Sequence, residues 1–482
     1  NYFNWVGSSQ VKSNTHRQCQ KIIIFLYIYI TRECRHVQSV KNTQRSPVMK
    51  SFKPIIIFLI VELSFVPATP DGVVITCYHS GEDSWEQTQV VKNASTHQIK
   101  EICPGDGEQN QRIEVKGSVK ILYEDSFKGI PKLRGINVYG TNLEEIEPGT
   151  FKDLPELDSV DLSSNNLQEI KSGTFVNLKV EYLSLPGNSI SLLQEKAFVN
   201  LSHVQELSLE KNNLQELKRG IFQDLHVTRI DLWSNNISKI EVGTFDTVFP
   251  RNDDGITLNL SNNSIAEIDS SVFDYKHTII LTLSDNSISV LRPGDLRNLP
   301  HLRDISLSGN KLKEVPEGVF NGSEIGFLVL NHNEISFIAS KAFDDMKHLY
   351  YVSLNNNKLK EWDSNWFRGE RRLSIIFSSN FLETIPAEAF TNIPEGTMLY
   401  LDHNRIKSIS DSAFTGVTKL EGIDLGHNEI EEWNVDLLKN VEVEDFVDLT
   451  DNKIKCPENG SGSLAPKAHT IYLTNCSQIV TG

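Results

Sequence analysis

Apolar residues recur along most of this chain with a period of about 24 residues. The segment Leu157-x-x-Val160-x-Leu162-x-x-Asn165-x-Leu167 has the same frame as Leu302-x-x-Ile305-x-Leu307-x-x-Asn310-x-Leu312. One position of the frame, called here the marker position, holds Thr141, Asn165, Asn188, Asn212, Asn235, Asn263, Asn286, Asn310, Asn333, Asn357, Asn380, Asn404, Asn428 and Asn452. A repeated apolar frame of this length predicts stacked copies of one structural unit rather than several independent cores.

Each position of the frame has a predicted structural role. The apolar residues before the marker alternate with polar ones, which predicts a short strand with one buried side, and stacked strands would form a parallel sheet. The marker amide can bond backbone groups that the turn after the strand leaves unpaired. A second series fills the opposite wall: Phe127, Phe151, Phe175, Phe198, Phe222, Phe245, Phe273, Leu296, Phe320, Phe343, Phe367, Phe390, Phe414 and Leu438.

This pattern is that of a leucine-rich repeat, and it resembles the 24-residue "typical" extracellular subfamily of Slit-like, Toll-like and small-proteoglycan-like ectodomains. The resemblance covers residues 113–455, about 14 repeats. It implies an α/β repeat fold, a curved leucine-rich-repeat solenoid. The parallel sheet would lie on the concave face, the convex side would be short helical or irregular, and disulfide-bonded caps would close both ends.

The first 70 residues differ from the repeats. They hold nine Lys or Arg residues against two acidic residues, and a basic segment that starts at Met49 precedes the apolar run Ile55–Ile60. This order is typical of a secretory signal peptide, which we place at residues 49–70. Residues 1–48 are interpreted as a disordered upstream or precursor extension. A folded domain over residues 1–70 is the less favoured alternative, because two isolated apolar runs offer little to pack against.

Four cysteines lie beside the ends of the array, where a solenoid must cover its core. Cys77 and Cys103 fall in an N-terminal cap over residues 71–112, and Cys456 and Cys476 fall in a short C-terminal cap over residues 456–482. In a secreted protein we expect the pairs Cys77–Cys103 and Cys456–Cys476, because cross-pairing would have to span the whole array. A metal site is the alternative, but the Cys-x2-Cys spacing is missing. We predict no metal and no cofactor.

Charge and composition narrow the classes of partner. The chain has 63 Asp and Glu against 47 Lys and Arg, a net charge of −16. This balance argues against nucleic acid, whose binding depends on Lys and Arg at phosphates. Asn-x-Ser/Thr sequons predict glycosylation in a secreted chain, at Asn93, Asn200, Asn236, Asn259, Asn262, Asn321 and Asn459. Asn259 lies between Leu258 and Leu260, so its side chain should project from the concave sheet.

Catalytic motifs are missing from the sequence: it has no phosphate-binding Gly loop, no His-Glu-x-x-His and no Gly-x-Ser-x-Gly. We therefore predict that the chain is not an enzyme. Three histidines, His332, His403 and His427, each precede a marker Asn. Solvated turn residues are the simpler interpretation of these histidines, and a metal or pH-sensing ladder is the alternative.

The side chains that alternate with the strand apolar residues should face solvent on the concave sheet. Strands stack about 5 Å apart, so an apolar and aromatic surface is predicted, here called the C-terminal patch: Phe327, Val329, Tyr351, Ile376, Met398 and Tyr400. Such a patch on an exposed sheet is typical of an interaction site. The N-terminal half instead carries acids, partly offset by Arg229 and Lys211: Asp158, Asp161, Glu181, Glu206, Glu210 and Asp231. These acids favour a basic partner; solubility is the alternative explanation.

One unit is longer than the others. The interval from Phe245 to Phe273 exceeds its neighbours by about four residues, within segment 246–255. Insertions in solenoids usually emerge as loops, so an exposed, flexible segment is predicted here, which limited proteolysis would cut first.

These observations favour a secreted protein that recognises an extracellular protein on its concave sheet, in adhesion, matrix or innate-immune roles. The resemblance supplies these roles, because the spacing itself indicates only the shape. One alternative is a non-catalytic subunit of a secreted enzyme complex. Another is a membrane receptor ectodomain whose C-terminus is missing, since we expect no membrane span in this chain.

Overall fold

The computed structural model describes residues 72–79, 87–92, 111–269, 271–272, 277–296, 299–368, 371–454, 465 and 467–473. The predicted extension over residues 1–48 and signal peptide over residues 49–70 lie outside the described residues. Within the described part of the chain, no helix is long and apolar enough to cross a membrane.

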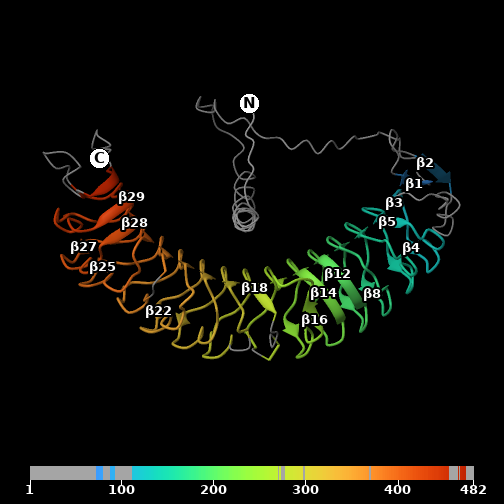
Figure 1. The fold of residues 1–482 in the computed structure, drawn as a ribbon, viewed down its shortest axis with the longest axis horizontal. Helices are drawn as coiled ribbons and strands as arrows, with labels where there is room; N and C mark the ends of the chain where they lie inside the picture. The colour runs from blue at the N-terminus through green and yellow to red at the C-terminus, as the bar shows by residue number, and fades with distance from the viewer. Residues whose placement is uncertain are drawn as a thin grey trace, which may run out of the picture. The chain divides into compact units, whose positions relative to one another are not determined.

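One large sheet runs through the repeats, and each strand pairs in parallel with the strand of the next repeat. Its repeat strands are β5 (Leu133–Asn137), β7 (Ser159–Asp161), β10 (Tyr182–Ser184), β12 (Phe198–Ser208), β14 (Phe222–Asp231), β17 (Ile256–Asn259), β18 (Thr278–Thr282), β19 (Asp304–Ser306), β21 (Phe327–Val329), β23 (Tyr351–Ser353), β24 (Ser374–Ile376), β26 (Thr397–Tyr400), β28 (Lys419–Asp424) and β29 (Glu442–Asp448). Strand β30 (Ala468–Tyr472) lies in the predicted C-terminal cap and pairs in parallel with β29. Figure 1 shows the array as an arc, with strands such as β18 and β28 along its inner side.

The register places the middle apolar residue of each strand beside its equivalent in the next repeat. Val160 pairs with Leu183, Leu183 with Leu207, and Leu207 with Ile230. These side chains are buried, whereas the residues on either side of them in each strand face the opening of the arc. That outward side of the sheet is called the concave face. The predicted alternation therefore decides which residues a partner can reach.

The marker asparagines form a ladder of hydrogen bonds between repeats. In Asn212, Oδ1 accepts the backbone N–H of Ile190 at 3.0 Å, and Nδ2 donates to the carbonyl oxygens of Leu185 and Leu209 at 3.1 and 3.0 Å. The same pattern recurs from Asn165 to Asn452. Because each amide bonds its own repeat and the preceding one, the ladder couples neighbouring repeats.

A line of phenylalanines fills the wall opposite the sheet. The rings of Phe151 and Phe175 stack with centroids 5.1 Å apart, and those of Phe343 and Phe367 at 5.2 Å. The next aromatic cluster lies around Trp362, whose ring is 5.1 Å from that of Phe390. Phe273, from the same series, lies outside the described residues. Burial of these rings explains why a large aromatic residue recurs at this position of most repeats.

The outer side of the array contains turns and very short strands. These strands are β4 (Ile121–Leu122), β6 (Glu145–Ile146), β8 (Glu169–Ile170), β11 (Leu192–Leu193), β13 (Glu216–Leu217), β15 (Lys239–Ile240), β20 (Glu314–Val315), β22 (Phe337–Ile338), β25 (Thr384–Ile385) and β27 (Ser408–Ile409). Figure 1 places β22 and β25 along the outer edge. The described residues contain no helix, so the α/β class and the helical convex side were wrong, and the irregular alternative holds. A unit of about 24 residues leaves few residues for the return path, which here takes extended and turn conformations.

The N-terminal cap extends the main sheet beyond the first repeat. Strand β3 (Gln111–Lys116) pairs in parallel with β5, and β1 (Gly72–His79) pairs antiparallel with both β3 and β2 (Gln87–Lys92). Cys77 is buried in β1 and is disulfide-bonded. Cys103, Cys456 and Cys476 lie outside the described residues, so the two pairings remain predictions.

The longer unit is packed at Val248–Pro250, which corrects the prediction of an exposed loop for that part of residues 246–255, while residues 252–254 are exposed as predicted. Strand β16 (Val248–Pro250) pairs with β14, and Val248 is fully buried. The Phe249 ring lies 5.3 Å from that of His226. The extra residues extend the sheet at the edge where β9 (Phe175–Val176), β12 and β14 also pair, because an apolar Val-Phe-Pro segment gains more by pairing there than by standing in solvent.

Candidate functional site on the concave face

Two rows of outward side chains follow the strand register along the concave face. The first row passes from Arg112 through Gly135, Ser159, Tyr182 and Glu206 to Arg229. The second row passes from Glu114 through Asn137, Asp161, Ser184 and Ser208 to Asp231. Strands β3 to β14 thus present a polar surface on which acidic residues outnumber basic ones.

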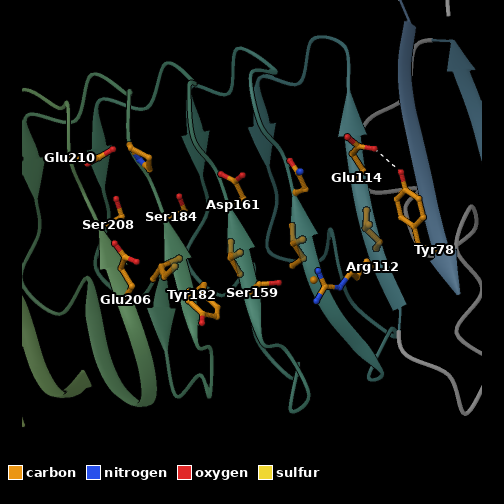
Figure 2. A pocket seen from close by; sticks show the side chains of 17 residues that line it. Tyr78, Arg112, Glu114, Ser159, Asp161, Tyr182, Ser184, Glu206, Ser208 and Glu210 are labelled. Atoms are coloured by element: carbon orange, nitrogen blue, oxygen red, sulfur yellow. Dashed lines mark hydrogen bonds between the residues drawn. The ribbon is translucent and has the colours of Figure 1, made fainter. Parts of the chain in front are cut away.

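A cavity of about 700 Å³ lies on this surface and is called the N-terminal cavity. Figure 2 shows its side chains projecting from successive strands on one side of the sheet. They include Tyr78, Arg112, Glu114, Asn137, Ser159, Asp161, Tyr182, Ser184, Glu206, Ser208 and Glu210. Tyr182 is 51% exposed, so about half of this residue is open to solvent. The cavity begins at the cap and spans five successive strands of the sheet.

The carboxylates of the N-terminal cavity differ in their partners. Glu114 accepts from the Tyr78 hydroxyl at 2.8 Å and lies 3.2 Å from Nζ of Lys116. Glu206 lies 3.5 Å from Nε of Arg229. Asp161 accepts the backbone N–H and the hydroxyl of Ser163, and Glu210 has its pKa raised, mainly by burial and then by the charge of Asp231. Among the described residues, neither Asp161 nor Glu210 lies within ion-pair distance of a cation.

A polar network occupies the centre of the concave face. Asp231, which is only 4% exposed, forms an ion pair with Arg229 and accepts from Nδ2 of Asn259 at 2.9 Å. Oδ1 of Asn259 in turn accepts from the Thr282 hydroxyl at 2.7 Å and from the backbone N–H of Ser261 at 3.1 Å. Asn259 does project from the sheet as predicted, but its amide is held by its neighbours.

The C-terminal patch is present as two rows of the sheet. Phe327 and Tyr351 are register partners, and their rings stack with centroids 4.3 Å apart. Ile376 and Tyr400 are partners in the second row, separated from Val329 by buried Ser353. Burial raises the pKa of the Tyr351 hydroxyl, and burial together with Asp424 raises that of Tyr400. The predicted residues therefore share one face, although serines interrupt both rows.

Met398 departs from the predicted patch because it is only 7% exposed. Its register partner is Gly422, and a Cβ at position 422 would lie 2.9 Å from the Met398 sulfur. The missing side chain of Gly422 lets Met398 lie across the neighbouring strand, so it supports the patch from within more than it offers contact area.

Acidic residues border the C-terminal patch. Asp424 is the register partner of Tyr400, and Asp448 follows it in the next strand. Burial raises the pKa of Asp424 to about 6, and the charges of Asp402 and Asp448 add to this shift, while the backbone N–H of Gly426 opposes it. The carboxyl of Asp424 therefore gains its proton at a higher pH than an ordinary aspartate.

The three predicted histidines lie in the turn before the marker, and each has a φ of +53° or +54°. Asn356 and Ser379 occupy the same position in other repeats and have similar φ values. This left-handed conformation supports the turn interpretation. His403 and His427 nevertheless stack with ring centroids 4.2 Å apart, and their Nδ1 atoms lie 2.8 Å from Asp402 and 3.1 Å from Asp451. Across the described ranges, no three His, Cys, Asp or Glu side chains are placed to hold a metal ion.

The remaining predicted sugar sites lie away from the strands' concave rows. Asn200, Asn236, Asn262 and Asn321 are exposed. Asn200 donates from Nδ2 to Oδ1 of Asn177 at 2.8 Å. Asn93 and Asn459 lie outside the described residues.

Sequence reasoning missed the contribution of the cap to the site. Tyr78, Arg112 and Glu114 line the N-terminal cavity from β1 and β3, but all three come before the first full repeat, whose marker is Thr141. The alternation Arg112-Ile113-Glu114-Val115 has the signature of a strand with one buried side. That signal was sufficient to extend the concave rows by one strand.

The fold defines a parallel β-solenoid of stacked repeats with an open concave sheet. The solved TLR13–ssRNA13 complex is similar with a TM-score of 0.38 and 16% identity, over 75% of this chain and 69% of that chain. A leucine-rich repeat protein of Leptospira interrogans is similar with a TM-score of 0.46 and 19% identity, over 72% of this chain and 92% of that chain. No curated protein sequence matches the chain.

Family models match the repeats themselves. The model of the BspA type leucine rich repeat region matches six copies over residues 84–201, 120–251 and 313–443. A leucine rich repeat model matches residues 257–312. The first model alone covers more than half of the chain, and the chain therefore belongs to the leucine-rich repeat family.

Proposed function

We propose that this protein is secreted and recognises an extracellular protein on its concave face, without catalysing a reaction. The observation that carries this proposal is the stacked pair Phe327 and Tyr351, half-buried on a sheet face that has no covering layer in the described chain. Aromatic residues at the centre of an open face supply most of the contact energy in many protein interfaces. Repeat length of about 24 residues supports the extracellular "typical" subfamily.

Secretion is supported by the sequence around Met49 and by the cysteine positions. The proposal requires cleavage after the apolar run, the pairs Cys77–Cys103 and Cys456–Cys476, and sugars at exposed sequons such as Asn236. N-terminal sequencing tests the cleavage, non-reducing peptide mapping tests the disulfide pairs, and glycopeptide mass spectrometry tests the sugars, each on protein from a eukaryotic host. Intracellular retention with free thiols would contradict the proposal.

Crosslinking mass spectrometry in the extracellular fluid from which the protein comes tests the partner-binding role. It compares capture of the partner by the unaltered protein and by variants of the C-terminal patch. Phe327→Ala with Tyr351→Ala should reduce partner capture by about tenfold or more, because both rings would leave the interface. Phe337→Ala with Val242→Ala is the matched control, since Phe337 is 57% exposed on the outer strand β22 and Val242 is also exposed. Thermal unfolding of both variants checks the fold. Equal capture of the partner by the two variants would show that the C-terminal patch does not bind it.

A further inference from the structure

We propose that the N-terminal cavity binds a segment of the partner protein that carries lysine or arginine side chains. This inference rests on the proposed function and names the chemistry of the partner at a second part of the concave face. Four carboxylates, Glu114, Asp161, Glu206 and Glu210, line the cavity with one guanidinium, that of Arg112. Complementary charge across an interface favours encounter and selects the partner.

The structure distinguishes acids that are already paired from acids that are not. Outside the cavity, Glu181 pairs with Arg251 at 2.9 Å, and Arg112 reaches to within 3.9 Å of Asp158 at the rim. Within it, Asp161 and Glu210 have no cation within ion-pair distance among the described residues. The charges of Asp161 and Glu210 are thus not paired within the described part of the chain, whereas Glu114 and Glu206 have Lys116 and Arg229 nearby. A cationic side chain from a partner would pair with the first two carboxylates.

Aromatic and hydroxyl groups in the cavity suit the same ligand. Tyr182 stands between Ser159 and Glu206 in the register, so its exposed ring lies beside a carboxylate. A ring next to a carboxylate binds ammonium and guanidinium groups through its negative face. The hydroxyls of Ser184 and Ser208 can bond the backbone of an extended segment.

The volume of the cavity favours a peptide segment. A volume of about 700 Å³ holds a few residues, and the lining side chains come from the cap strands β1 and β3 and from the repeat strands β5, β7, β10 and β12. Arg112 lies across Gly135, where an added Cβ would be 2.9 Å from the Arg112 Cγ. The Arg112 side chain, which lies over Gly135, therefore marks the end of the acidic surface next to the N-terminal cap.

The test measures binding of three labelled octapeptides to the purified full chain by fluorescence anisotropy. In these peptides serine alternates with lysine, glutamine or glutamate. The lysine peptide should bind, and its affinity should fall as salt is raised, because salt screens the partly exposed charges. The glutamine and glutamate peptides should bind less tightly. Equal binding of the lysine and glutamine peptides would overturn the proposal.

Two charge-neutralising variants locate the binding. Asp161→Asn with Glu210→Gln keeps the side-chain oxygen that caps Ser163 and should weaken the lysine peptide by about fivefold. Glu317→Gln with Glu383→Gln is the matched control, because both residues are exposed outside the strands. Unchanged binding by the first variant, or an equal loss in the control, would overturn the assignment to the cavity.

A second pair of variants keeps the test valid if the charge variant does not fold. Tyr182→Ala should weaken the lysine peptide, whereas Tyr139→Ala should not, since Tyr139 is 58% exposed but does not line the cavity. If no peptide discriminates while native capture still depends on Phe327 and Tyr351, the cavity inference is wrong and the proposed function stands. If capture is also insensitive to the patch, both are wrong.

Discussion

The guanidinium of Arg251 donates to the carboxylate of Glu181 at 2.9 Å, although the two residues lie 70 positions apart in the chain. The same guanidinium donates to Oε1 of Gln205 at 2.9 Å. Arg251 follows β16, so the longer unit reaches back over two earlier repeats. This contact ties together strands that the repeat ladder connects only through their neighbours.

Replacing Arg251 should loosen the longer unit. Arg251→Ala removes both bonds, and we expect faster proteolysis within residues 246–255 with a loss of stability of about 1 kcal/mol or less, because the Glu181 partner is half-exposed. Hydrogen exchange at Val248 and Phe249 measures the local effect. Lys407→Ala, at an exposed cation without an ion pair among the described residues, is the control. Rapid cleavage of the unaltered chain at this segment would show that the packing described here is wrong.

The asparagine ladder should dominate the stability of each repeat. Asn212→Ala leaves the backbone N–H of Ile190 without its side-chain acceptor, at a cost of about 1 to 3 kcal/mol. The carbonyl oxygens of Leu185 and Leu209 lose one donor each but keep the bonds from Asn188 and Asn235. Asn213→Ala, one residue later and exposed, should change the free energy of unfolding by less than about 0.5 kcal/mol. Urea unfolding followed by circular dichroism compares the two variants. Similar midpoints would contradict the ladder's role.

Stability should depend on pH through Asp424. Because burial raises its folded-state pKa to about 6 above the ordinary value of 3.8, the folded state binds the proton more tightly than the unfolded state. The contribution of this group to stability is therefore fully present below about pH 4 and is lost as pH rises through about 6. Asp424→Asn should stabilise the protein at pH 7.5 by up to about 1 kcal/mol, a discounted value because water screens the half-buried group.

Thermal unfolding between pH 4 and pH 8 measures this dependence. The advantage of Asp424→Asn over the unaltered protein should shrink towards pH 4, where the native carboxyl is also neutral. Asp411→Asn, on the outer loop before Phe414, is the control and should follow the unaltered protein. An advantage that is independent of pH would contradict the assignment to titration of Asp424.

Sugar occupancy should separate Asn259 from its neighbouring sequons. Nδ2 of Asn259 donates to buried Asp231, so an attached sugar would displace this bond and disturb the centre of the concave face. Asn236 and Asn262 are exposed. Glycopeptide mass spectrometry of protein from a eukaryotic secretory host should find the latter two occupied and Asn259 unmodified. A fully occupied Asn259 in folded protein would contradict the expectation and would mask the concave centre.

The repeat frame contained enough information to predict the solenoid and its exposed rows. Burial of Leu183, Leu207 and their equivalents forces the alternating residues onto the concave face, so Phe327 and Tyr351 were placed correctly from the period alone. The return path was harder to predict. Helical and extended segments of similar length can both connect such strands, and the local sequence does not distinguish them strongly.

The repeat, its marker asparagines and the row to which each strand residue belongs can be read from the amino-acid sequence, because they follow from a period and from the burial of apolar side chains. Tertiary structure alone decided which neighbours meet across repeats. It placed Met398 over Gly422, Arg251 on Glu181 and Asn259 on Asp231, and it extended the concave rows into the cap. Such contacts depend on the lengths of the side chains and on the space between strands of separate repeats. The repeat period along the sequence does not specify either of them.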